Sequence, residues 1–145
     1  MKDKIVEELD RIIFHDLPFE GLSFDFNKKT ASFEFNEYDD FKKEYQPLTI
    51  KFNGVNKFQS DYPDDIAFEP TGCNSAEYER LIDTYEIRFI MELCNEFTLW
   101  DVKISFSSLE IHRTLSPLAI EYKNTHFASR MDEREWLDKH GLSLV

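Results

Sequence analysis

The sequence predicts a mainly β fold, α+β by helix content: an antiparallel β-sandwich or a strongly curved sheet with a short N-terminal helix and a C-terminal helix packed on it. In residues 22–26 and 31–35, large apolar and polar side chains alternate strictly. A period of two is typical of a strand with one buried and one solvated face. The same rhythm recurs in residues 48–52, 85–93 and 100–106. A length of 145 residues suits one domain, so we expect a single domain over 1–145.

The first element predicted is a short helix that begins after Asp3, a residue able to cap it. Its apolar side chains fall on one side, at Ile5, Leu9, Ile12 and Ile13. Residues 14–18 should end this helix because the residue before Pro18 avoids helical angles.

The next elements are two strands, the first beginning near Phe19, joined by a short polar turn over residues 27–30. The bulky row expected to face inward is Leu22, Phe24, Phe26, Phe33 and Phe35. The opposite row is polar and leans acidic, and we expect it on the surface: Ser23, Asp25, Asn27, Ser32, Glu34 and Asn36.

Residues 37–44 are rich in charges and indicate a solvated loop or one helical turn, after which Pro47 opens a third strand. Asn53-Gly54 is a strong hairpin signal, yet residues 55–58 could also continue the same strand past a glycine bulge, which we favour. Residues 61–65 should form a loop. Residues 67–75 are the most irregular stretch and should connect two portions of the sheet.

The second half predicts strands over residues 78–82, 85–93, 97–106 and 109–113. The apolar faces of the two longer ones are Tyr85, Ile87, Phe89, Met91 and Leu93, then Trp100, Val102, Ile104 and Phe106. Residues 118–122 indicate at most a short strand or an extended arm. A terminal helix over about 130–140 has a good cap in Ser129 and a C-terminal Gly141.

Charge and absences limit the possible functions. The chain carries 29 acidic and 17 basic side chains, a formal charge of -12, which disfavours nucleic acid and serves either solubility alone or the attraction of a basic protein partner. Cys73 and Cys94 lack zinc-site spacing and suit a reducing compartment. We also expect no cofactor and no membrane partner, since four glycines form no phosphate-binding loop and no apolar run could span a bilayer. The predicted location is therefore the cytoplasm.

Catalytic signals are weak. His15 and Asp16 could form an acid–base pair, but at a helix-to-strand junction Asp16 is more naturally a turn residue and His15 a cation at the helix C-terminus. A hydrolase of unrecognised type using His15 or His112 would need a carboxylate or hydroxyl beside the imidazole in a cleft. Another alternative is a β-sandwich or half-barrel that binds a small ligand between its sheets.

The acidic residues Asp61, Asp64, Asp65 and Glu69 could bind calcium, be merely solvated, or form part of a protein-binding face. Tyr62 among them favours the last option because tyrosine is enriched at interfaces.

Residues 14–60 resemble the immunity-type β domains of bacterial polymorphic toxin systems. The resemblance lies in the Phe14-His15-Asp16 opening, the alternating strand pair, and residues 48–55. It implies an intracellular, non-enzymatic protein that binds and blocks a toxin domain. The residues we expect to contact this basic partner are Asp39, Asp40, Asp61, Tyr62, Asp64 and Asp65.

Overall fold

A computed structural model of the chain describes residues 3–61, 70–93 and 99–129. It confirms a mainly antiparallel β protein with one short helix toward each end. The sheet is open and has eight strands in the order β4-β7-β6-β5-β1-β2-β3-β8. The strands are β1 (Leu17–Asp25), β2 (Thr30–Asp39), β3 (Glu44–Asn53), β4 (Lys57–Asp61), β5 (Pro70–Arg80), β6 (Tyr85–Leu93), β7 (Leu99–Phe106) and β8 (Ser108–Arg113).

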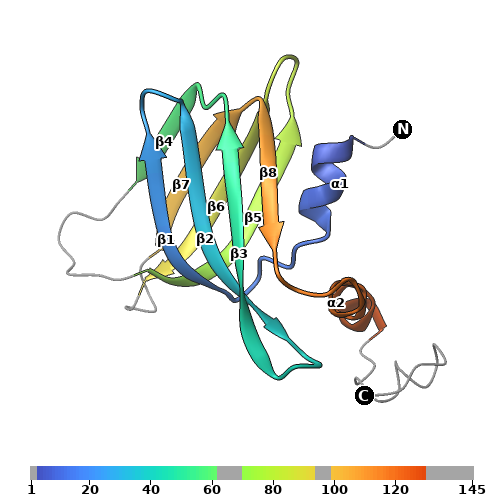
Figure 1. The fold of residues 1–145 in the computed structure, drawn as a ribbon. Coiled ribbons are helices and arrows are strands. Elements are labelled where there is room, and N and C mark those ends of the chain that lie inside the picture. Colours follow the sequence, from blue (N-terminus) through green and yellow to red (C-terminus); the bar gives the residue numbers. More distant parts are fainter. Residues whose placement is uncertain (1–2, 62–69, 94–98, 130–145) are drawn as a thin grey trace.

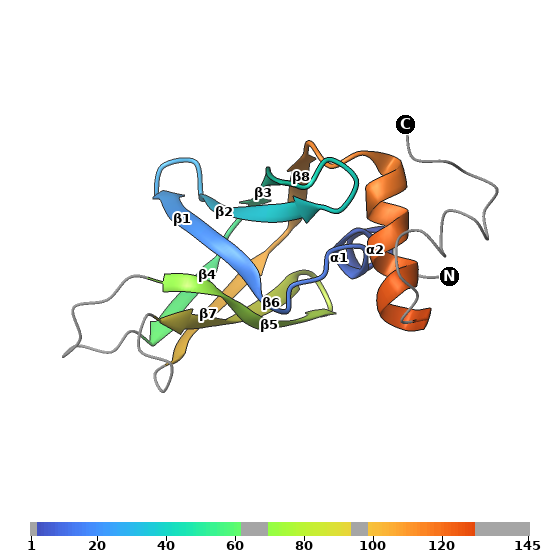
Figure 2. The same ribbon diagram turned by 90° about the horizontal axis from the view of Figure 1, so that it is seen from below.

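The sheet folds over on itself into two facing halves. One half contains β1, β2, β3 and β8, and the other contains β4, β7, β6 and β5 (Figures 1 and 2). At one corner the halves are joined by β1 and β5, which pair at Leu17↔Cys73 and Pro18↔Gly72. This arrangement is the strongly curved, sandwich-like sheet that the alternating pattern predicted.

At the other corner the chain passes from β3 to β4 through Gly54. β3 pairs with β8 up to Asn53↔Ser108, and β4 pairs with β7 from Lys57↔Ser105. From Asn53 to Lys57 the chain advances four residues, whereas the opposing segment from Ser105 to Ser108 advances three. One extra residue is therefore accommodated near Gly54. Gly54 has φ +62°, and a Cβ there would lie 2.0 Å from Oγ of Ser107. The structure therefore has the bulge rather than a β3–β4 hairpin.

The core lies between the two halves and is dominated by aromatic rings. Phe33 stacks on Phe89 with ring centroids 4.8 Å apart, and Phe52 meets Phe106 at the same distance. The predicted inward rows of β6 and β7 are confirmed as buried at Ile87, Phe89, Met91, Trp100, Val102, Ile104 and Phe106. In the first strand pair the prediction for Phe26 was wrong. This side chain is 83% exposed because it lies beyond the end of β1.

Helix α1 (Lys4–Asp10) is shorter than predicted, although Asp3 caps it as expected, accepting hydrogen bonds from the backbone of Ile5 and Val6. Helix α2 (Pro117–Ser129) occupies the region predicted as a short strand or arm. That prediction was wrong because Ser116 and Pro117 form a helix start: Ser116 Oγ accepts from the backbone N–H of Ala119 at 3.2 Å, and proline suits the first helical position. The predicted helix over 130–140 lies outside the described residues.

Two predicted loops are partly strand. β2 continues to Asp39 and β3 begins at Glu44, so the predicted loop or helical turn over 37–44 shrinks to residues 40–43, a single turn closed by Lys43 N–H to Asp39 O at 2.8 Å. Residues 70–75 are the first part of β5, where the register with β6 shifts between Pro70 and Gly72 and again between Cys73 and Ser75. These irregularities break the two-residue period, which is why the strand could not be recognised. None of the described helices is both long and apolar enough to cross a membrane.

Candidate functional site

Asp39 does not contact solvent, contrary to the prediction that it would bind a partner. It is 1% exposed, and its Oδ1 accepts hydrogen bonds from the backbone N–H groups of Phe41 and Lys42 at 2.9 and 3.0 Å. Its backbone carbonyl accepts another from Lys43 N–H at 2.8 Å. Asp39 therefore stabilises the tight β2–β3 turn, and these hydrogen bonds keep its carboxylate inside the turn instead of on the surface.

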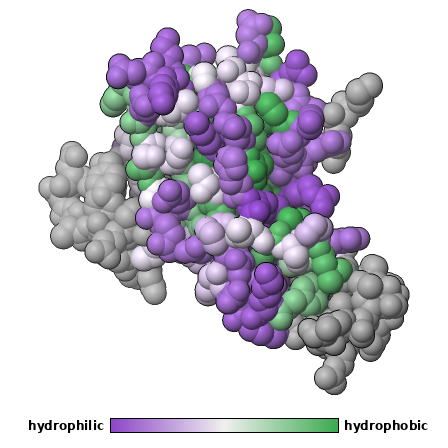
Figure 3. All heavy atoms as spheres, viewed as in Figure 1, coloured by the Kyte–Doolittle hydropathy of each residue, from purple (hydrophilic) through white to green (hydrophobic). Residues whose placement is uncertain are grey.

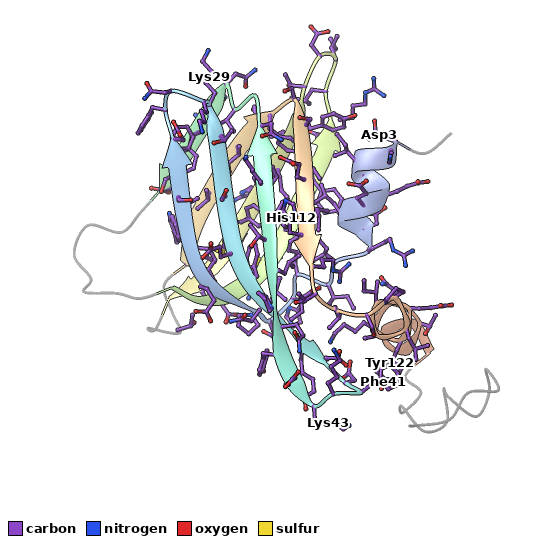
Figure 4. The ribbon with its side chains drawn as sticks, viewed as in Figure 1. Asp3, Lys29, Phe41, Lys43, His112 and Tyr122 are labelled. Carbon is purple, nitrogen blue, oxygen red and sulfur yellow. The ribbon has the colours of Figure 1, made fainter. Side chains whose placement is uncertain are left out.

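Asp40 also acts inside the molecule. Its carboxylate lies 3.3 Å from Nζ of Lys123 on α2, and its side chain is 24% exposed. Beside this ion pair the ring of Phe41 meets that of Tyr122 at 5.3 Å, and Figure 4 shows these two side chains next to each other. The turn thus packs on α2, and Asp40 is a half-buried, ion-paired residue where the sequence predicted a freely exposed one.

Of the six predicted contact residues, Asp61 is the one that the structure describes as exposed. It is the last residue of β4, in the half of the sheet opposite to Asp39 and Asp40, so the structure does not bring the three together. Tyr62, Asp64 and Asp65 lie outside the described residues, as does Glu69. Within the described part of the chain, no group of three or more His, Cys, Asp or Glu side chains could hold a metal ion.

Asp61 lies on a strongly charged surface, the outer side of the half formed by β4, β7, β6 and β5. Strand alternation directs polar side chains outward here while the alternate residues fill the core. We call this surface the outer charged face and define it by Asp61, Glu77, Glu79, Glu86, Arg88, Asp101 and Lys103. Two hollows of about 280 and 530 Å³ lie on it and share Arg88 and Lys103.

The two cations of the face are engaged by three of its acids, since Arg88 also lies 3.9 Å from the carboxylate of Glu77. Arg88 donates to both carboxylate oxygens of Asp101, with Nη2 to Oδ2 at 2.6 Å and Nε at 3.0 Å from each oxygen. These hydrogen bonds raise the pKa of Arg88. Lys103 Nζ lies 3.2 Å from the carboxylate of Glu86. Both cations are therefore committed within the face.

Two acidic pairs lie directly opposite each other on neighbouring strands: Glu79↔Glu86 at one corner and Asp61↔Asp101 at the other. Like charges in directly opposed positions destabilise a sheet. Because Lys103 and Arg88 neutralise Glu86 and Asp101, the uncompensated members are Glu79 and Asp61, for which no ion pair is found among the described residues. The face thus offers two separated carboxylates to a cation from outside.

The sequence reasoning missed every member of this face except Asp61. A signal was present, because charges repeat with a period of two at Glu77 and Glu79, at Glu86 and Arg88, and at Asp101 and Lys103. The apolar positions dominate the pattern of these strands, and the alternate charged positions are typical of any solvated strand face.

His15 and Asp16 do lie in a cleft, of about 120 Å³, which is also lined by Tyr38, Tyr45 and Lys123. The imidazole Nε2 is 3.2 Å from Asp16 Oδ2, and Nδ1 is 3.0 Å from the backbone oxygen of Asn74. Both side chains are 69% exposed.

The prediction of Asp16 as a turn residue is confirmed, since it has φ +61° and lies in a turn closed by Leu17 N–H to Phe14 O at 3.1 Å. The prediction of His15 at a helix C-terminus is wrong because α1 ends at Asp10. His112, the other histidine considered, is exposed on β8.

Comparisons with known proteins give little. No family model matches the chain, and no curated protein matches it. A solved structure described as an uncharacterized protein from Neisseria gonorrhoeae is similar, with a TM-score of 0.45 and 19% identity over 69% of this chain and 93% of that chain.

Proposed function

We propose that this protein is a non-enzymatic binding protein that captures a basic protein partner through the outer charged face. The observation that carries the proposal is the pair of uncompensated carboxylates, Glu79 and Asp61, at opposite corners of the face. Each stands directly opposite another acid, a costly arrangement that Lys or Arg side chains of a partner would relieve.

The charge of the whole chain supports the same proposal. A formal charge of -12 raises the association rate of a basic partner, most strongly at low ionic strength. The bidentate Arg88–Asp101 pair and the Lys103–Glu86 pair fix the centre of the face, so the free acids are presented from a rigid sheet. The partner need only supply two basic groups at a matching separation.

From the resemblance of residues 14–60 to immunity-type domains, we propose that the partner is a basic toxin domain. We propose also that the two proteins meet in the cytoplasm. Asp39 and Asp40 no longer belong to the contact surface, because they hold the β2–β3 turn and bind α2. The proposed contact residues are Asp61 and Glu79, with Glu77 beside them.

The experiment measures binding of a fluorescent lysine-rich peptide, as a defined basic probe, by anisotropy at several salt concentrations. The test variant is Asp61→Lys with Glu79→Lys. The matched control is Glu34→Lys with Glu121→Lys, which makes the same change in net charge at two exposed acids outside the face. We expect the test variant to lose about tenfold or more in affinity and to show a weaker salt dependence, and the control to change about twofold.

Equal losses in the two variants would show that net charge alone attracts the peptide, and the proposed face would be rejected. A protein encoded by a neighbouring gene, where it is basic, provides the second probe. Retention of its full affinity by the Asp61→Lys, Glu79→Lys variant would likewise reject the face.

The two alternatives have less support. A ligand site between the halves competes with aromatic rings that already fill that space, such as the Phe33–Phe89 stack. A hydrolase using His15 has the required carboxylate at 3.2 Å, but the described residues of the cleft include no serine, threonine or cysteine nucleophile.

A further inference from the structure

The turn between β1 and β2 presents an aromatic side chain to solvent in a fixed position. Phe26 is 83% exposed. Asp25 Oδ1 accepts hydrogen bonds from the backbone N–H groups of Asn27 and Lys28 at 3.0 and 3.1 Å, which fixes the turn. The ring of Phe24 meets that of Phe26 edge-on at 4.6 Å, so the exposed ring is supported from beneath. Phe26 is therefore a preformed protrusion on the surface.

Three lysines lie at the same end of the molecule as this protrusion. Lys28 and Lys29 follow Phe26 in the turn, and the backbone oxygen of Lys29 accepts from Val55 N–H at 2.9 Å, which places Lys57 at the same corner. No ion pair joins any of these three lysines to a carboxylate within the described residues, so their charges are available to an anion from outside.

A second apolar protrusion lies at the same end of the molecule. Ile82, in the turn between β5 and β6, is 94% exposed, and this turn shares a hollow with Asn56, the neighbour of Lys57. Figure 1 shows the β1–β2 and β5–β6 turns at one end of the sandwich, and Figure 4 places Lys29 there and Lys43 at the opposite end. In Figure 3 hydrophobic atoms are visible at this end beside hydrophilic ones. Asp83 beside Ile82 is the exposed acid at this second turn.

The shape and charge of this end indicate which class of partner could bind it. Two apolar side chains that protrude from separate turns need either two matching pockets or one fluid apolar layer, and unpaired lysines beside them favour an anionic surface. We propose that this end docks on the surface of a bilayer containing anionic lipids, with Phe26 and Ile82 entering the headgroup layer and Lys28, Lys29 and Lys57 contacting phosphates.

This peripheral contact differs from our sequence-based expectation of no membrane partner, which rested on the lack of a spanning segment. The acids that dominate the chain do not prevent it, since salt screens charges beyond about 8 Å at physiological ionic strength. Of the two free acids of the outer charged face, Asp61 lies at the end of β4 opposite to Lys57 and remains available, whereas Glu79 lies three residues before Ile82 and would be near the lipid.

The test is flotation of the full chain with vesicles made of equal parts phosphatidylglycerol and phosphatidylcholine, compared with phosphatidylcholine alone. We expect binding to the anionic vesicles only. Phe26→Ser should abolish measurable flotation, and Lys28→Glu with Lys57→Glu should weaken it by about fivefold or more per lysine. The matched controls are Tyr45→Ser, an exposed aromatic of the β2–β3 hairpin, and Lys42→Glu, an exposed lysine in its turn; both should bind like the unchanged protein.

Absence of flotation for the unchanged protein, or equal losses in the controls, overturns the proposal. Two further measurements address other partners of the same end. If a single-stranded oligonucleotide binds and Phe26→Ser removes that binding while vesicles are ignored, the end is a nucleic-acid site. If Phe26→Ser changes the sedimentation of the lipid-free protein, the end contacts a second copy. Either result rejects docking on lipid.

Discussion

Arg113, the last residue of β8, holds the buried carboxylate of Glu37, which lies two strands away on β2. Its Nε donates to Glu37 Oε2 at 3.1 Å, and its Nη2 donates to Oε1. Glu37 is 2% exposed, and the Arg113 side chain is 11% exposed. Nη1 of the same guanidinium donates to the backbone oxygen of Arg11, just after α1, at 3.4 Å. One side chain therefore joins β2, β8 and the end of the first helix.

Removing Arg113 should be far more harmful than removing the pair. In Arg113→Met the carboxylate of Glu37 stays buried without a partner, and we expect a loss of about 3–5 kcal/mol in the free energy of unfolding. The double variant Glu37→Leu, Arg113→Met should recover most of this loss because no charge remains buried. Urea denaturation of the three proteins measures both effects. A single variant as stable as the unchanged protein would mean that water reaches Glu37.

Gly54 should be sensitive to the addition of a single methyl group. Gly54→Ala forces a side chain into the left-handed region and against Ser107, and we expect a cost of about 2 kcal/mol or more. Gly21→Ala is the control, since its Cβ would meet only Glu34 at 3.8 Å without a positive φ. Thermal unfolding of both variants should show a large shift at Gly54 and a small one at Gly21. Equal shifts would contradict a specific requirement for glycine at the corner.

Much of this fold was predictable because it depends on the two-residue period. Phe33, Phe35, Ile87 and Phe89 were placed inward by alternation alone, and they are buried. Failures occurred where another effect overrode the period. The register shifts around Gly72 hid the first part of β5, and Pro117 indicated a break where it begins a helix. Pairing between distant strands, such as β4 with β7, has no local signal.

The candidate site was less predictable than the fold for a related reason. Acidic residues between predicted strands look exposed, yet Asp39 is buried by the hydrogen bonds of its own turn and Asp40 by Lys123 on α2. The second effect depends on how the hairpin packs against α2, a helix far along the chain. Glu79 became a candidate only when strand pairing placed it opposite Glu86.

Glu79→Gln tests whether the outer charged face carries an electrostatic cost. Removing one of two opposed carboxylates should increase the free energy of unfolding by a few tenths of a kcal/mol, since Lys103 already compensates Glu86 in part. Glu34→Gln, an exposed glutamate that faces Thr49 across its pair of strands, should change stability less. Chemical denaturation at low ionic strength gives the clearest comparison. A loss of stability in Glu79→Gln would mean that Glu79 makes a favourable contact that its ion-pair geometry does not reveal.

Asp3 should make the stability of the protein depend on pH below about 4. The hydrogen bond from the Tyr85 hydroxyl, 2.7 Å from Oδ2, is the largest cause that lowers the pKa of Asp3 from its usual 3.8. Because the pKa is lower in the folded state, the stabilisation is present above pH 3.8 and is lost as the pH falls through the lowered value. Asp3→Asn keeps the cap and removes the titration, so its stability should vary less with pH over this window. Identical acid profiles for the two proteins would contradict this role.

Cys73 should be inert toward thiol reagents in the folded protein. Its side chain is 0% exposed, and burial raises its pKa to about 12, so almost no thiolate exists near neutral pH. The Sγ–H also donates to the backbone oxygen of Ser75 at 3.3 Å, at the corner where β5 pairs with β1. In a Cys94→Ser variant, which leaves Cys73 as the single cysteine, we expect no rapid colour release from a disulfide reagent at pH 8 and complete reaction after unfolding in guanidinium. The rate of the slow reaction should rise with added denaturant, because access to the thiol requires the β1–β5 corner to open. A fast reaction without denaturant would show that this corner opens readily in the native state.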